Sequence, residues 1–215
     1  MRDMSRLLDI GLEQLTSIVL KMGEAAEKAV RTSIAGFMGG QDVSEQVSEL
    51  SEMLVTMTVT VEDKAFELIV KYQPVASDLR IINSYMKIAY DFERYGRYAW
   101  DISLTHQRFA ASRKCVHNED LMEKMVDKTL HMVRKSIEAL RDNNGEMVKS
   151  LAETENEVDK IYSSYLDILA ETPLAAEGGI CNLLVIRYLE RIADHATYVG
   201  EAIYYIATGE KIILR

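Results

Sequence analysis

The sequence predicts an all-α protein built from two tandem three-helix bundles. Three observations support this prediction. The chain has only two prolines and eleven glycines in 215 residues, which leaves little room for the many turns of an all-β fold. Apolar residues recur in alternating steps of four and three, as they do on the buried side of an amphipathic helix. The pattern of the third such segment recurs 97 residues later, which indicates an internal duplication.

Three helices are expected in the first half of the chain. The first ends near the glycine pair 39–40, because glycines after the last periodic residue favour a helix C-terminus. The second opens around Asp42 or Ser44 and stops before Pro74, since the residue preceding a proline disfavours helical geometry. The third has the clearest seam, meaning the row of apolar residues that faces the other helices, and it ends before the polar stretch 111–118. The seam residues of the second and third helices are Leu50, Leu54, Met57 and Val61, then Ile81, Tyr85, Ile88, Phe92, Tyr95, Ala99 and Ile102.

Three further helices are expected in the second half. The fourth ends at the turn 143–145, whose two asparagines and glycine tolerate left-handed backbone geometry. The fifth begins its seam at Met147, which runs to Ile168, and the helix stops at Thr172 before a proline. The sixth follows the glycine pair 178–179 and is closed by the segment 208–209.

The duplication sets the expected domain boundaries. A shift of 97 residues places Glu93 and Arg94 over Glu190 and Arg191, and it also aligns the second helix with the fifth. We therefore expect one three-helix repeat over residues 1–111 and another over 118–209. Short connections favour antiparallel neighbours, so each repeat is expected to be an up-down-up bundle, and the two bundles to dock side by side.

The charge and hydropathy of the chain exclude several classes of function. A net charge of −9 disfavours binding to nucleic acid, which needs a dense lysine and arginine surface. No stretch approaches the roughly 20 apolar residues that a membrane span requires. The first 15 residues carry three acidic side chains within their apolar pattern, unlike a signal peptide. We expect a cytoplasmic protein that is peripheral to a membrane at most.

Four carboxylates beside the seams of the fifth and sixth helices form a candidate metal site. Glu155 and Asp159 are four residues apart, and so are Glu190 and Asp194, which places each pair one turn apart on its helix. If the two helices are antiparallel, both pairs face a shared groove. Crowded carboxylates repel one another, and a divalent or trivalent cation relieves that repulsion.

The first repeat holds a degenerate version of this site. Glu62 and Glu93 are present, but Thr58 and Arg97 occupy the positions of the other two acids. The guanidinium of Arg97 can take the place of a cation there. We therefore expect one competent cluster, in the second repeat.

Non-metal interpretations of these residues remain open. Acidic residues on the flank of an amphipathic helix are commonly a solvated face. Arg94 and Arg191 each follow a glutamate directly and can form salt bridges instead. His195 adjoins Asp194, but adjacent helical residues point about 100° apart, so we expect a packed or exposed histidine rather than a ligand.

Longer segments resemble a known family. The segments 73–80 (QPVASDLR) and 91–97 (DFERYGR) resemble the third-helix signature of the PhoU family, and 189–196 (LERIADHA) resembles the same signature in its other repeat. Length, duplication and helix order also agree, so the resemblance spans nearly the whole chain.

The resemblance implies a regulator of phosphate uptake rather than an enzyme. Family members carry metal clusters with the pattern ExxxD, which often hold zinc or iron, and they act with the Pst phosphate importer. Where a two-component system is present, they help to hold the PhoR kinase off when phosphate is ample. The expected partners are therefore a PstB-like ATPase, a PhoR-like sensor kinase and a second copy of the chain.

Two other functions are alternatives. A di-iron carboxylate enzyme normally supplies Glu-x-x-His from each of two helices, and this sequence has no such motif. A structural helical adaptor would use its acidic flanks only for solubility. The sequence also contains no phosphate-binding glycine-rich loop and no nucleophile elbow.

Overall fold

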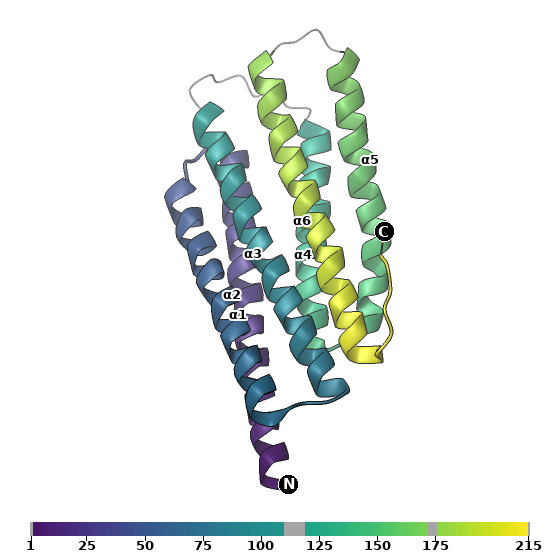
Figure 1. Ribbon diagram of the computed structural model, residues 1–215. Coiled ribbons are helices and arrows are strands. Elements are labelled where there is room, and N and C mark those ends of the chain that lie inside the picture. Colours follow the sequence, from purple (N-terminus) through teal and green to yellow (C-terminus); the bar gives the residue numbers. More distant parts are fainter. Residues whose placement is uncertain (1, 110–118, 172–175, 215) are drawn as a thin grey trace.

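The computed structural model describes residues 2–109, 119–171 and 176–214, and these segments fold into long antiparallel helices (Figure 1). No β-strand occurs in these ranges, which confirms the all-α fold class. The elements are α1 (Arg2–Gly39), α2 (Ser44–Tyr72), α3 (Ser77–Phe109), α4 (Glu119–Asp142), the 3₁₀ turn η2 (Gly145–Val148), α5 (Lys149–Glu171) and α6 (Ala176–Thr208).

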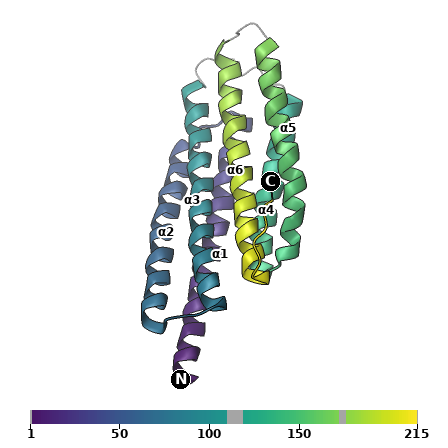
Figure 2. The same ribbon diagram turned by 45° about the vertical axis from the view of Figure 1, so that its right-hand side comes forward.

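The helices form two three-helix bundles that lie side by side. Helices α1, α2 and α3 pack against one another, as do α4, α5 and α6. The bundles meet mainly through α3 against α6, with α1 against α4 behind them (Figures 1 and 2). The predicted pair of tandem bundles is therefore confirmed, and the third helix of each repeat lies at the centre of the molecule.

One hydrophobic core runs through both bundles. Tyr95 of α3 is completely buried, and its hydroxyl lies 3.2 Å from the Oγ atom of Ser136 on α4. Phe92, one turn earlier, is equally buried and packs edge-to-face on Tyr95. Such large aromatic side chains bury enough apolar area to stabilise the contact between the bundles by several kcal/mol, at roughly 25 cal/mol per Å².

Most helix ends lie where the sequence predicts them. Gly40 after α1 and Gly209 after α6 have φ angles of 67° and 79°, the left-handed geometry that glycine adopts without strain. Gln73 ends α2 in the same geometry, and its N–H donates to the carbonyl of Ile69 at 3.0 Å. Pro74 then prevents the helix from continuing.

The start of the fifth helix differs from the prediction. Residues 145–148 form a 3₁₀ turn, so Met147 precedes α5 rather than belonging to it. The side chain of Asn144 accepts a hydrogen bond from the backbone N–H of Glu146 at 3.1 Å, which stabilises this tighter turn. At the other end of α5, the predicted seam residue Ile168 is 39% exposed, because the last turns of this helix lie at the edge of the bundle.

The start of the sixth helix also differs. It begins at Ala176, so the glycine pair 178–179 lies within its first turn rather than before it. A Cβ atom at Gly179 would come within 3.0 Å of Leu169 Cδ2 on α5. The glycine therefore permits a close approach of two helices, a role that the sequence pattern does not distinguish from that of a glycine in the connection between them.

The seam of α2 is rotated slightly from the predicted one. Leu50 and Met57 are only partly buried, whereas Ser51 and Thr58 are buried. The hydroxyl of Thr58 donates to the carbonyl of Leu54 at 3.1 Å, so its burial leaves no unsatisfied donor. A small polar residue can thus face the core when its hydroxyl group donates a hydrogen bond to a carbonyl of its own helix.

The segment after α6 turns back along that helix. The backbone N–H of Leu214 donates to the Oε1 atom of Glu201 at 3.0 Å, and the Leu214 side chain is buried. The chain beyond residue 209 is therefore part of the packed structure. The predicted boundary stretch 111–118 lies outside the described residues. Within the described part, no helix is both long and apolar enough to cross a membrane.

Candidate functional site

The four acidic residues predicted for the second repeat lie on two packed helices, Glu155 and Asp159 on α5 and Glu190 and Asp194 on α6. Their position beside the seams of the two helices predicts side chains that are half covered and half open to water. Instead, Glu155, Glu190 and Asp194 are only 5%, 7% and 8% exposed, and Asp159 is exposed. Three carboxylates are thus buried more deeply than expected, while the fourth lies at the solvent edge.

The structure brings three of these acids into one electrostatic cluster. Burial and the neighbouring charge of Asp194 raise the pKa of Glu190 to about 7, although Arg187 and Arg191 oppose the shift. Burial and the same Asp194 charge raise the pKa of Asp159. Near neutral pH, Glu190 therefore carries a proton for much of the time unless a cation stabilises its charge.

Two arginines of α6 pair with acids of the cluster. The Nη1 atom of Arg187 lies 2.5 Å from Glu190 Oε1, and Arg191 pairs with Asp194. The salt-bridge alternative weighed for Arg191 is therefore realised, and Arg187 makes the corresponding pair that the sequence analysis overlooked. The i, i+3 spacing of these residues was the signal available for it.

One carboxylate oxygen of the cluster has no protein partner. Glu190 Oε2 is buried and accepts no hydrogen bond. A buried acceptor left in this state costs about 1–3 kcal/mol, and a bound cation would remove that cost. The donor chemistry of the cluster therefore fits a cation that prefers oxygen ligands.

The cluster is not preassembled as a coordination shell. Within the described part of the chain, no three His, Cys, Asp or Glu side chains are grouped as metal ligands. A cation at these carboxylates would compete with the guanidinium groups of Arg187 and Arg191. Their side chains are 42% and 31% exposed, so both guanidinium groups can reach water.

The first repeat shows no comparable arrangement in the residues described. Glu62 on α2 is exposed, and Glu93 on α3 is partly buried. The guanidinium of Arg97 lies over the ring of Trp100 at 4.9 Å, and Arg94 donates to the Tyr98 hydroxyl at 2.8 Å. Both arginines thus engage aromatic side chains of their own helix instead of the expected carboxylates.

A buried polar pair that the sequence pattern does not predict lies between the repeats. His195 Nδ1 of α6 lies 2.8 Å from Asp91 Oδ1 of α3, and both side chains are 7% exposed. Burial raises the pKa of Asp91, and the contact with His195 opposes that rise. The sequence left open whether His195 is packed or exposed, and the structure shows it packed. An acidic residue next to the apolar seam of the third helix was the signal for the pair.

The duplication gives the pair a counterpart. The 97-residue shift relates Asp91 to Tyr188 and His195 to Tyr98, and these two tyrosines stack with their ring centroids 6.2 Å apart. Equivalent positions of the α3–α6 interface thus hold a polar pair in one case and an aromatic pair in the other, and the two pairs adjoin, because the rings of Tyr98 and His195 lie 5.8 Å apart.

Comparison with known proteins gives one family throughout. A family model described as PhoU domain matches residues 19–105 and 122–203. The "Phosphate-specific transport system accessory protein PhoU homolog" of Clostridium acetobutylicum is 29% identical over 217 residues, covering 97% of this chain and 98% of the relative. The protein of the same description from Rhizobium meliloti is 30% identical over 209 residues, covering 94% and 87%.

Solved structures support the fold. The crystal structure of PhoU from Pseudomonas aeruginosa superposes with a TM-score of 0.88 at 24% identity, covering 94% of this chain and 99% of that one. The structure of the phosphate transport system regulatory protein PhoU from Streptococcus pneumoniae gives a TM-score of 0.86 at 20% identity, covering 96% and 99%. At these sequence identities, the structural similarity establishes the shared fold alone.

Proposed function

Because this chain belongs to the PhoU family, we propose that it is a metal-binding negative regulator of phosphate uptake that acts with a phosphate-specific ABC transporter. The observation that carries the proposal is that the family model matches both repeats, and not only one of them. Relatives that cover almost the whole chain are described as accessory proteins of a phosphate-specific transport system, which supports a regulatory rather than a catalytic role.

The metal part of the proposal rests on the α5–α6 carboxylates. Glu190 has a buried oxygen without a partner, and the negative charge of Asp194 adds to the free-energy cost of ionising the Glu190 carboxyl group. A cation would stabilise both charges at once. Of the two metals that the family resemblance implies, we favour iron over zinc, since a set of carboxylate ligands without histidine or cysteine fits the harder cation.

The partners we propose are a PstB-like ATPase, a PhoR-like sensor kinase where one is present, and a second copy of the chain. One side of α2 supports contact with a protein. Val55, Val59, Phe66 and Val70 recur there at helical spacing, and all four are exposed. Exposed apolar residues gathered along one helix are typical of interaction surfaces.

Phosphate uptake in cells tests the function. Deletion of the gene should raise the rate of ³²P-phosphate uptake under phosphate-replete conditions, and expression of the wild-type chain should return the rate to its original value. The double variant Glu190→Ala, Asp194→Ala should return the uptake rate to that value only in part. Its matched control is Glu123→Ala, Asp127→Ala, an ExxxD pair on α4 that is exposed. Unchanged uptake in the deletion strain would refute the proposed function.

A structural adaptor is the second candidate, and one observation favours it. Arg187 and Arg191 already neutralise Glu190 and Asp194, so the cluster can exist without a cation. In that case the Glu190→Ala, Asp194→Ala variant would restore regulation as fully as the Glu123→Ala, Asp127→Ala control, provided that both accumulate to wild-type levels.

A further inference from the structure

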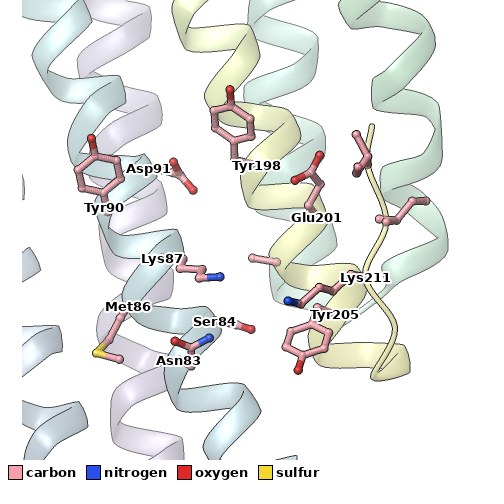
Figure 3. A pocket seen from close by; sticks show the side chains of 13 residues that line it. Asn83, Ser84, Met86, Lys87, Tyr90, Asp91, Tyr198, Glu201, Tyr205 and Lys211 are labelled. Carbon is pink, nitrogen blue, oxygen red and sulfur yellow. The ribbon is translucent and has the colours of Figure 1, made fainter. Parts of the chain in front are cut away.

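A groove of about 710 Å³ lies between α3 and α6, on the side where the segment 209–214 runs back along α6 (Figure 3). Its volume falls within the roughly 300–1,000 Å³ that is usual for small-molecule sites. None of the four α5–α6 carboxylates lines it. The groove is therefore a separate feature, and its chemistry can be considered independently of the metal proposal.

One end of the groove is basic. Lys87 comes from α3 and Lys211 from the segment after α6, and in Figure 3 their amino groups point toward one another from opposite walls. Neither lysine takes part in an ion pair among those formed by the described residues. The side chains of Asn83 and Ser84 point into the same end, and each can donate a hydrogen bond.

The other end combines aromatic rings with an acceptor. Tyr90 and Tyr198 lie there on opposite helices (Figure 3), and both rings contact His195, with centroid distances of 6.3 and 5.3 Å. Two carboxylates also line the groove: Asp91 is held by His195 at 2.8 Å, and Glu201, which stands between the two ends, accepts the N–H of Leu214. A carboxylate has room for about four hydrogen bonds, so Glu201 can accept further donors from a ligand.

We propose that this groove binds a nucleoside phosphate, with the phosphate between Lys87 and Lys211 and the base against Tyr90 and Tyr198. A phosphate monoester carries a charge of about −1.5 to −2 near neutral pH, which matches two ammonium groups. Base stacking on an aromatic ring is tolerant of sequence and is a common mode of recognition. The amino and hydroxyl groups of a nucleoside are donors that suit Glu201.

Two features argue for a whole nucleoside phosphate rather than free phosphate. The groove is several times larger than an orthophosphate ion, and most of its lining is apolar or aromatic. Orthophosphate alone would leave that surface hydrated, whereas a base covers it. The site holds phosphate by lysine side chains, which act as point charges, and this is consistent with the absence of a glycine-rich loop from the sequence.

Isothermal titration calorimetry of the full chain in metal-free buffer tests the proposal with three probes: AMP, adenosine and orthophosphate. AMP should bind saturably, and each of the two fragments at least about tenfold more weakly. Lys87→Ala and Lys211→Ala should each weaken AMP binding by about tenfold, the loss expected for one charge-assisted hydrogen bond. Lys28→Ala, an exposed lysine of α1 outside the groove, should leave it unchanged.

Each other outcome would overturn a defined part of the proposal. No heat of AMP binding at millimolar concentration refutes the site. Orthophosphate that binds as tightly as AMP refutes the role of the base, and adenosine that does so refutes the role of the lysines. Hydrogen exchange gives an independent readout, because AMP should protect amides in 209–214. Protection confined to other segments would contradict the location. Lys87 and Lys211 are exposed, so their variants should fold, and circular dichroism checks this.

Discussion

Asp91 of α3 and His195 of α6 hold the two repeats together through a hydrogen bond of 2.8 Å, in a place where almost no water reaches either side chain. The residues are 104 positions apart in the chain, and each lies on the central helix of its own bundle. A buried polar pair of this kind stabilises one register of the two helices over others, because any shift leaves both groups without a partner.

Removing one member of the pair should destabilise the protein. In Asp91→Ala the imidazole of His195 is left buried without its acceptor, and we expect a loss of about 2 kcal/mol in the free energy of unfolding by urea. Asp63→Ala, which removes an exposed acid of α2, should change stability by less than about 0.5 kcal/mol. A double-mutant cycle with His195→Ala should show a coupling energy of about 1 kcal/mol or more. Additive effects of Asp91→Ala and His195→Ala on the free energy of unfolding would contradict a direct interaction between the two side chains.

The pKa of Glu190 predicts a pH dependence of stability in the metal-free protein. Its folded-state pKa is about 7, against an ordinary value of 4.5, so the folded state binds the proton more tightly than the unfolded state does. Stability should therefore fall as pH rises from about 4.5 to about 7. Glu190→Gln removes this dependence and should stabilise the protein on the order of 1 kcal/mol at pH 8 but little at pH 4.5. Equal effects at both pH values would be inconsistent with a raised pKa.

Metal content should depend on the α5–α6 cluster. Elemental analysis of untagged protein, purified without chelator and then loaded with iron or zinc, is expected to find metal in the wild type and in the Glu123→Ala, Asp127→Ala control. The Glu190→Ala, Asp194→Ala variant should lose it. Because protons compete for the same carboxylates, affinity should also fall as pH drops below 7. Equal metal content in all three proteins would place the metal elsewhere, and its absence from all would favour the adaptor.

Arg187 should act against metal binding. Its guanidinium pairs with Glu190 in the metal-free protein and must leave before a cation can bind there. Arg187→Gln is therefore expected to lower the melting temperature of the metal-free protein slightly and to raise metal affinity several-fold. Lys160→Gln, which removes an exposed charge of α5, is the control. Weaker metal binding in Arg187→Gln would show that the arginine supports the site.

Gly96 should resist substitution because α2 and α3 approach closely there. A Cβ atom at this position would lie 2.5 Å from Leu54 Cδ1 and 3.4 Å from the Ser51 Cα atom. We expect Gly96→Ala to cost about 1–3 kcal/mol in thermal or urea unfolding. Gly39→Ala, at the end of α1 with open space around it, should be neutral or stabilising. The duplication places Ala193 at the equivalent position of α6, where a Cβ atom is accommodated.

The sequence predicts the helices and the repeat well, because their signals are local. The helix ends at Gly40, Pro74 and Gly209 follow from the backbone geometry of those residues themselves. A seam such as that of α3 is recognised from the helical period of its apolar residues alone. Gly179 was placed before the sixth helix because a glycine in a connection and one that lets another helix approach look the same in sequence.

The site was predicted only in part, because its properties depend on packing between elements. The spacing of Glu190 and Asp194 indicates that they are neighbours, but their depth of burial is set by α5 and α4, and the pKa of Glu190 follows from that depth. The contact of Asp91 with His195 depends on how the bundles dock, which helical periodicity alone does not encode.

The unequal pairs across the α3–α6 interface have a consequence for stoichiometry. A duplicated chain with faithful symmetry would present every surface site twice, and titrations would give two equivalents per molecule. Here Asp91 lines the groove and pairs with His195, while the stacked Tyr188 and Tyr98 occupy the matching positions farther along the same α3–α6 interface, where Tyr98 also contacts the ring of His195. The chain should therefore take up one equivalent of a groove ligand, and an asymmetric partner can distinguish the two repeats and dock in a single orientation.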